Sequence, residues 1–252
     1  MKISRIFIFL VLFLLTACGS NVPEPDTIPP TTVPPTEVPV TVTSPSSADE
    51  AQASPTAVPN TDEEPIQTEE QAVLSSFSES VTATGETLLL YGHVLDASGV
   101  PLSGYAVEIW QVDADGIYDH PGDGNTSDRD MGFQFYGTSL TDEHGLFAFR
   151  TIVPARYEPR PRHIHFKVKK NGQTVMTSQF YFTGDVNVDE MLQLSLFDAQ
   201  DANGDPIKLA SKDIVINTGS GGNLPLTPSQ QEGPYYPVID VSTFDNDLAS
   251  VQ

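Results

Sequence analysis

Two histidines separated by one residue, His163 and His165, are the side chains in this sequence best placed to share a metal ion. They open a strand-like segment, and the two-residue period of a β-strand directs both imidazoles to the same face. The preceding residues add the phenol of Tyr157 and the guanidinium groups of Arg160 and Arg162. A His-x-His pair also occurs as surface or hydrogen-bonded polar histidines, so the pattern alone fits either a metal site or a polar strand face.

Short strand-like segments must position these side chains. Each is rich in β-branched or aromatic residues and is bounded by Gly, Pro, Asp or Asn, which favour turns. The predicted strands are 87–95, 106–111, 146–152, 163–169, 174–182 and 212–217. Helical periodicity is limited to a short stretch near 188–197. We therefore expect residues 73–252 to form one all-β domain, an antiparallel β-sandwich with long irregular loops that carry the site. The longest predicted loop is 113–138.

The charge pattern argues against nucleic acid as a partner. The chain has a formal net charge of -22, and no Lys or Arg occurs between Arg5 and Arg129. Such an acidic chain has no basic surface with which to neutralise phosphates. We assign the acidity to solubility rather than to a cation site.

The N-terminal residues predict secretion and a lipid anchor. Residues 1–17 combine Lys2 and Arg5 with an apolar run too short to span a bilayer, which is typical of a signal peptide. Cys18 is the only cysteine, so it cannot form an intrachain disulfide, and the sequence LTAC at 15–18 resembles the lipobox of bacterial lipoproteins. We expect lipidation of Cys18 to hold the protein on the extracellular face of a bacterial envelope membrane, although a cysteine without function also fits.

Residues 18–72 are rich in Pro, Thr, Ser and acidic residues and poor in large apolar side chains. Such a composition cannot offset the entropy cost of ordering, so this segment is predicted to be a disordered, partly polyproline stalk. The stalk is expected to hold the folded domain away from the membrane.

Several ordered motifs carry a more specific signal. They read GHVLD at 92–96, VEIWQ at 107–111, GIYDH at 116–120, TD at 141–142, FRTI at 149–152, RPRHIHF at 160–166 and QFYF at 179–182. Together they resemble the intradiol ring-cleavage dioxygenases, the family of protocatechuate 3,4-dioxygenase and catechol 1,2-dioxygenase. The resemblance implies an enzyme that cleaves a catechol-type ring with O2 at a non-haem ferric centre and yields a muconate-type dicarboxylic acid, without an external reductant.

The same resemblance implies that Tyr118, Tyr157, His163 and His165 are the iron ligands. Phenolates are hard, strongly donating anions that favour Fe(III), and a nearby cation is needed to ionise a group with a pKa of about 10. In the family, the counterpart of Tyr157 leaves the metal and takes up a catechol proton. Without the resemblance, the preferred interpretation of Tyr118 is a half-buried aromatic packed beside Pro121.

Two further residues have implied catalytic roles. Arg160 matches an arginine that lies against the substrate ring and stabilises developing charge, and Gln179 matches an amide near it. A surface ion-pairing arginine and a solvent-facing glutamine are the alternatives. Trp110 is expected in the core, with a secondary role beside the metal site.

The order of the motifs departs from the family. Residues 227–237, with the sequence TPSQQEGPYYP, resemble a segment that precedes the sandwich in relatives and lines the substrate pocket. We interpret this as circular permutation with one cut near Val251 and Ala83, which folds tolerate when the native termini lie close together. It predicts that 227–237 pack near the metal and that the new ends are neighbours. Gly233, Pro234 and Tyr235 are then expected to form substrate-pocket walls.

Two other interpretations fit parts of the sequence. A non-catalytic β-sandwich on a stalk, serving adhesion or spacing, is compatible with the fold. A zinc or copper site would keep the histidines, although two phenolates disfavour it. The substrate expected from the resemblance is a small aromatic diol, and the resemblance allows oligomerisation. It does not distinguish catechol, protocatechuate, hydroxyquinol or chlorinated derivatives.

Overall fold

The structure, a computed structural model, describes residues 68–185 and 187–251. The predicted signal peptide, Cys18 and nearly all of the predicted stalk lie outside these residues. The helices and 3-10 turns are α1 (Glu69–Ser75), η1 (Thr126–Asp128), η2 (Glu190–Leu192) and η3 (Val241–Thr243). The strands are β1 (Thr87–Asp96), β2 (Ala106–Trp110), β3 (Tyr136–Leu140), β4 (Leu146–Ile152), β5 (His163–Lys170), β6 (Gln173–Phe182), β7 (Gln193–Leu194), β8 (Phe197–Gln200), β9 (Pro206–Ser211) and β10 (Ile214–Ile216).

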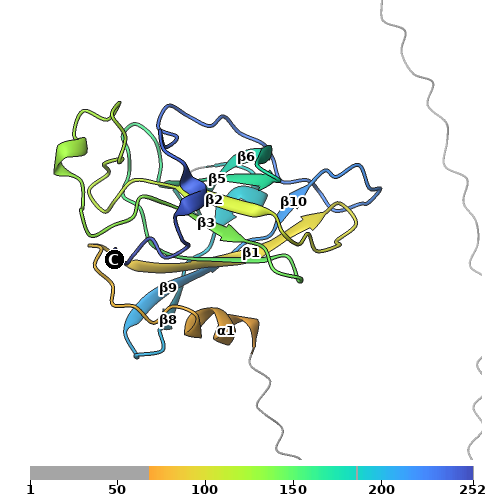
Figure 1. Cartoon of the computed structure of the whole chain (residues 1–252), viewed down its shortest axis with the longest axis horizontal. Helices are drawn as coiled ribbons and strands as arrows, with labels where there is room; N and C mark the ends of the chain where they lie inside the picture. The colour runs from red at the N-terminus through yellow and green to blue at the C-terminus, as the bar shows by residue number, and fades with distance from the viewer. Residues whose placement is uncertain (1–67, 186, 252) are drawn as a thin grey trace, which may run out of the picture. The chain divides into compact units, whose positions relative to one another are not determined.

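The strands form two five-stranded sheets (Figure 1). The first, here called the β1 sheet, has β1 paired antiparallel with β4 and parallel with both β9 and β10, while β8 pairs antiparallel with β9. The second, the β5 sheet, has the order β3-β2-β5-β6-β7, and only its β6–β7 pair is parallel. The predicted all-β sandwich is confirmed, with antiparallel pairing in the majority, and the sheets are mixed because β1–β9, β1–β10 and β6–β7 pair in parallel.

The two sheets are joined by an apolar core to which alternate residues of each strand contribute. On β5, Ile164, Phe166 and Val168 point inward and are fully buried, in contact with the cluster that includes Leu88 and Phe149 of the β1 sheet. The two-residue period therefore leaves His163, His165, Lys167 and Lys169 on the opposite face of β5. That outer face of the β5 sheet is where the site is built.

A helix covers the outer face of the β1 sheet, beside β8 and β9 (Figure 1). The Thr68 hydroxyl caps α1 by accepting a hydrogen bond from the backbone N–H of Gln71, and Val73 and the following Phe77 pack on Leu89. The predicted domain start at residue 73 thus falls inside α1, which begins at Glu69. The burial of Val73 and Phe77 stabilises α1, whose first residues, 69–72, were predicted from composition to belong to the disordered stalk.

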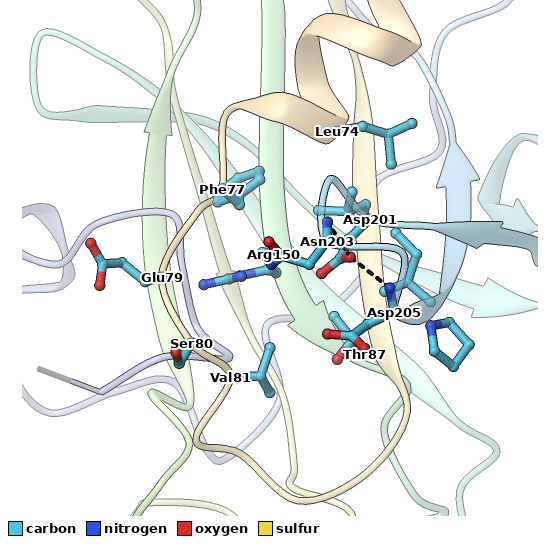
Figure 2. A pocket seen from close by; sticks show the side chains of 13 residues that line it. Leu74, Phe77, Glu79, Ser80, Val81, Thr87, Arg150, Asp201, Asn203 and Asp205 are labelled. Carbon is cyan, nitrogen blue, oxygen red and sulfur yellow. Dashed lines mark hydrogen bonds between the residues drawn. The ribbon is translucent and has the colours of Figure 1, made fainter.

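Next to α1 lies a cavity of about 340 Å³, drawn in Figure 2. Arg150 of β4 contributes to its lining and forms a bidentate ion pair with Asp247 at 2.8 Å and 2.5 Å. Its guanidinium carbon lies 5.7 Å from the ring centre of Phe77. Because the cavity belongs to the β1 sheet, it is separate from the histidine face.

Two local predictions are wrong, and strands β8 and β9 were not predicted. The predicted loop 113–138 ends early because β3 begins at Tyr136. The backbone of Asp245 passes close to β3 at Gly137, where a Cβ would come within 2.3 Å of the Asp245 carbonyl oxygen. The helical stretch predicted near 188–197 contains only η2, because pairing with β6 draws the next residues into β7. Strands β8 and β9 were missed, since their polar residues face solvent. Within the described residues, no helix is both long enough and apolar enough to cross a bilayer.

Candidate metal centre and ring-cleavage site

The two histidines lie side by side at the start of β5. Both side chains are buried, with 2% exposure each, and their Nε2 atoms are 3.1 Å apart. His163 Nδ1 lies 2.7 Å from the carbonyl oxygen of Pro161, so this nitrogen carries the proton and donates it to that oxygen. The Nε2 lone pair of His163 is therefore directed away from the backbone and into the cluster, which is the tautomer a metal requires.

Of the two predicted tyrosine ligands, Tyr118 contacts His163 directly and Tyr157 packs on Tyr118. Tyr118 follows β2 in a loop held by a hydrogen bond from its backbone N–H to Asp123 Oδ2 at 2.9 Å. Its hydroxyl lies 3.2 Å from His163 Nε2, and its ring centre is 5.5 Å from that of Tyr157. The structure thus brings together the four side chains assigned as ligands, from two loops and one strand.

Burial dictates the protonation of this cluster at neutral pH when no cation is bound. Desolvation lowers the pKa of His163 to about 4 and that of His165 to about 2, so both imidazoles are neutral. Desolvation raises the pKa of Tyr118 well above 10.0, and the hydrogen bond with Tyr235 raises the pKa of Tyr157 to about 12. Neutral imidazoles are ready to coordinate, whereas the phenols need a strong cation to ionise.

The donor set fits a ferric ion. The donors are two imidazole nitrogens, the Tyr118 phenol beside them and the Tyr157 phenol that packs on Tyr118, and once ionised such phenols form with imidazoles a donor set that suits iron(III). In addition, His165 Nδ1 is buried without a hydrogen-bond partner among the described residues. At most one of the two facing Nε2 atoms can donate a hydrogen bond to the other, and His165 Nδ1 would then remain an unpaired acceptor. A cation bound by both Nε2 atoms would let His165 carry its proton on Nδ1 instead. His163, His165, Tyr118 and Tyr157 are the residues that would hold the cation.

Arg160 is held beside this cluster by two side chains of β6. Its Nη2 donates to Gln179 Oε1 at 2.6 Å and to the hydroxyl of Tyr181 at 3.2 Å. Gln179 is opposite His165, and Tyr181 is opposite His163 in the β5–β6 register. A guanidinium fixed in this way provides a preorganised positive charge next to the side chains that would hold the metal.

The C-terminal segment 227–237 packs against the same site. Tyr235 places its hydroxyl 2.7 Å from that of Tyr157 and stacks on Tyr118 at 4.8 Å between ring centres. Gly233 has a φ of +80°, and a Cβ there would lie 3.2 Å from His165 Cε1. Pro234, the third predicted wall residue, is exposed between them. Gly233 and Tyr235 are therefore in contact with the ligand cluster, and Pro234 lies at its rim.

The regions predicted as new chain ends are also neighbours. The backbone N–H groups of Thr82 and Ala83 donate to the carbonyl oxygen of Ala249, at 2.9 Å and 3.1 Å, and Val251 N–H donates to Thr82 Oγ1 at 2.9 Å. Both spatial conditions set by the permutation hypothesis are thus met. The permutation itself stays a prediction, because this geometry does not reveal the order of segments in an ancestor.

Comparison with known proteins identifies the family. The sequence profile of a family described as "Dioxygenase" matches residues 59–201, more than half of the chain. The chain belongs to the intradiol dioxygenase family. Among family members, it is similar to a catechol 1,2-dioxygenase of Acinetobacter baylyi, with 33% identity over 119 residues, covering 40% of this chain and 37% of the relative. It is also similar to the protocatechuate 3,4-dioxygenase beta chain of Burkholderia cepacia, with 38% identity over 110 residues, covering 40% and 46%.

The chain therefore spans less than half of the length of these characterised relatives. Among solved structures, the dioxygenase domain of a dioxygenase and carbohydrate-binding fusion from Streptomyces sp. SirexAA-E has 32% identity and a TM-score of 0.45, covering 55% of this chain and 84% of that one. Catechol 1,2-dioxygenase from Acinetobacter sp. ADP1 has 26% identity and a TM-score of 0.46, covering 55% of each chain. Residues 202–252, which include the segment beside the ligand cluster, lie outside the matched family profile.

Two residues of the site were missed from the sequence. Tyr181 had no predicted role, although its spacing from Gln179 places both on one face of β6. Tyr236 also had none, yet its hydroxyl reaches Glu108 at the base of the 227–237 segment. Period-two spacing could have identified Tyr181, whereas no local pattern indicates where a loop residue such as Tyr236 will dock.

Proposed function

We propose that this protein cleaves small aromatic diols of the catechol type between their two hydroxyl-bearing carbons, using O2 and a non-haem ferric ion. The observation that carries the proposal is the grouping of buried Tyr118, His163 and His165 with the partly buried Tyr157, which packs on Tyr118. The characterised relatives named above include catechol and protocatechuate dioxygenases, which supports the same reaction class. Both atoms of O2 enter the product, a muconate-type dicarboxylic acid, so no external reductant is needed.

The protein side chains have distinct tasks in this reaction. When bound, the ferric ion supplies an electron-accepting centre that makes the catecholate ring reactive toward O2. Tyr157 Oη is the base that accepts a catechol proton, and the Tyr235 hydroxyl 2.7 Å away stabilises it in either protonation state. The Pro161 carbonyl keeps His163 in the coordinating tautomer. Burial of both imidazoles excludes water from their side of the centre.

Arg160 stabilises negative charge as the ring loses aromaticity. Its fixed hydrogen bonds to Gln179 and Tyr181 mean that no reorganisation is needed when that charge develops. Gln179 also donates from Nε2 to the Gln231 carbonyl oxygen at 3.0 Å, which links the arginine to the C-terminal segment. Gln179 is thus a positioning residue for Arg160, and Gly233 and Tyr235 border the space for the diol.

Iron loading and product analysis test this proposal. The protein loaded with ferrous iron in air is expected to develop a visible tyrosinate-to-iron charge-transfer band, to shift that band on anaerobic addition of catechol, and to consume O2 and catechol in equal amounts. His165→Ala should abolish all three responses. His144→Ala is the matched control, because His144 is a solvent-exposed histidine paired with Glu143. A colourless wild-type protein after loading, or one that retains zinc or copper instead, would overturn the proposal.

The substrate within this class is found with a panel of catechol, protocatechuate, hydroxyquinol and chlorocatechols under identical conditions. The ratios of kcat/KM among them define the preference. Equal inactivity towards the whole panel, in protein that binds iron, would contradict a ring-cleavage function and favour a binding role for the domain.

We further propose that the protein is a lipoprotein anchored through Cys18 on the extracellular face of a bacterial membrane. Support comes from the N-terminal sequence, with its short apolar run and single cysteine. Mass spectrometry of the mature N-terminus should find an acylated Cys18 and no residues 1–17. A mature N-terminus that carries an unmodified Cys18, or that begins elsewhere, would contradict this anchor.

A further inference from the structure

The segment 227–237 is attached to the β5 sheet by a polar cluster in which the partly buried Tyr236 and Lys169 surround the buried Glu108. The Tyr236 hydroxyl donates to Glu108 Oε2 at 2.9 Å and accepts from Lys169 Nζ at 3.2 Å, while Lys169 Nζ also donates to Glu108 Oε1 at 2.5 Å. Glu108 is completely buried, so its charge depends on these two partners. Each member of the triangle satisfies the other two, which fixes the Tyr236 ring at one place on the sheet.

The ring of Tyr236 makes further contacts on the same face. It meets the edge of Trp110 at 5.0 Å between ring centres and an interplanar angle of 86°. The ammonium of Lys167 lies 3.3 Å from the Tyr236 ring centre and forms an ion pair with Glu232 at 2.6 Å. A cation held over an aromatic face adds a directional attraction that an apolar contact lacks. The segment is thereby attached both through Tyr236 and through the residue before Gly233.

Two short routes lead from Tyr236 to the ligand cluster. Through side chains, Trp110 packs on the Tyr236 ring and stacks on His165, with ring centres 4.7 Å apart and planes 7° from parallel. Through the backbone, the adjacent Tyr235 places its hydroxyl 2.7 Å from that of Tyr157. A shift of Tyr236 would therefore change the imidazole plane of one ligand and the hydrogen bond of another.

From these contacts we infer that Tyr236, held by Glu108 and Lys169, is a positioning residue of the ring-cleavage site: it sets the orientation of His165 through Trp110 and the placement of Tyr157 through Tyr235. This inference rests on the proposed function. The polar and aromatic contacts of the Tyr236 side chain are with Glu108, Lys169, Lys167 and Trp110, and it acts on the reaction through these residues and the adjacent Tyr235.

A cover that served only to exclude water would not need this chemistry. Replacing a buried ion pair by apolar groups of similar volume is often neutral or stabilising, whereas a satisfied polar network favours one arrangement over others. The network here lies on the face where His163, His165, Lys167 and Lys169 follow one another on β5. The directional hydrogen bonds among Tyr236, Glu108 and Lys169 fix the position of segment 227–237 over this face of β5.

The test compares Tyr236→Phe with Tyr105→Phe. Both changes remove one hydroxyl and keep the ring, and Tyr105 is also next to a lysine, with Lys170 Nζ 4.3 Å from its ring centre, just before β2. Trp110 is the only tryptophan in the chain, so intrinsic fluorescence excited at the red edge reports on the residue between Tyr236 and His165. Acrylamide quenching of this fluorescence is measured on metal-free protein, and the thermal midpoint of each variant establishes that it is folded.

For Tyr236→Phe we expect stronger acrylamide quenching, a shifted tyrosinate-to-iron band, and a kcat lowered about tenfold with little change in KM, in line with loss of a hydrogen bond to a charged group. Tyr105→Phe should match wild type in all three measurements. If the two variants behave alike while wild type is active, only the positioning role is refuted. If wild-type protein neither binds iron nor cleaves catechols, the proposed function fails and the positioning role fails with it, whatever the fluorescence shows.

Discussion

Gly233 offers a direct test of how closely the C-terminal segment approaches the metal site. In Gly233→Ala the new Cβ would stand 3.2 Å from His165 Cε1 and 3.8 Å from Nε2, the atom that faces the ligand cluster. The first distance requires a displacement of a few tenths of an ångström. The backbone φ of +80° adds strain of roughly 1 kcal/mol for a residue with a side chain.

Gly204→Ala separates these two effects. Gly204 lies in the turn between β8 and β9 with a φ of +87°, and a Cβ there would have no neighbour within 4 Å. Both variants should therefore lose about 1 kcal/mol of unfolding free energy, which lowers the thermal midpoint by roughly 2–4 °C for a domain of this size. Only Gly233→Ala should also disturb His165.

The assay is steady-state catechol cleavage together with the tyrosinate-to-iron band. Misplacement of a reacting group by about 1 Å can cost roughly 100-fold in rate, so a shift of a few tenths of an ångström is expected to lower kcat/KM about tenfold in Gly233→Ala. Gly204→Ala should keep the wild-type value. Equal kcat/KM for the two variants, at equal stability, would refute the placement of Gly233 against His165.

Three other predictions address the arginine, the helix and acid stability. Arg160→Gln should lower kcat by roughly 100-fold while leaving the iron band in place, because a fixed charge donor is lost but no ligand is; loss of the band would contradict its assignment. Phe77→Ala should lower the unfolding free energy by about 3 kcal/mol in denaturant titrations, since Phe77 is only 8% exposed in the cluster under α1, and no change would mean that α1 does not dock. Hydrogen bonds, the largest from Ser98, hold the pKa of Asp96 well below its ordinary 3.8, so ionised Asp96 stabilises the fold above about pH 4 and this contribution fades as the pH falls further. Asp96→Asn should accordingly be less stable than wild type at pH 7, with the difference shrinking below pH 4; a difference that grows in acid would contradict the sign.

The parts of the fold that were predicted correctly are those with dense local signals. Strand β4, at Leu146–Ile152, has the predicted bounds, and β1 and β5 differ from prediction by one residue at the C-terminal end. Alternating apolar residues between turn formers determine such strands with little help from the rest of the chain. Strand β3 was missed because Gly137 has a low strand propensity, and the reason for a glycine there, the nearby backbone of Asp245, is contributed by residues distant in sequence.

The candidate site shows the same division. The period of β5 predicts that His163 and His165 share a face, and this follows from local geometry alone. The convergence of Tyr118 and Tyr157 on that face depends on two loops, so only the family resemblance could suggest it. The docking of Tyr236 and Lys167 was not foreseen, because charged residues within a strand ordinarily indicate solvent, whereas here a returning segment covers them.

That returning segment also constrains when the site can form during folding. The strand with both histidines is complete by Lys170, but the residues that cover its outer face begin only at Thr227, so the site is closed by contacts between segments far apart along the chain. Such contacts form late, since the intervening loop must first be closed against chain entropy. In a nascent chain that ends before residue 227, the outer face of β5 with its histidines and lysines would be exposed to water. The contacts that enclose the histidine face are therefore complete only after the C-terminus has returned to the β5 sheet.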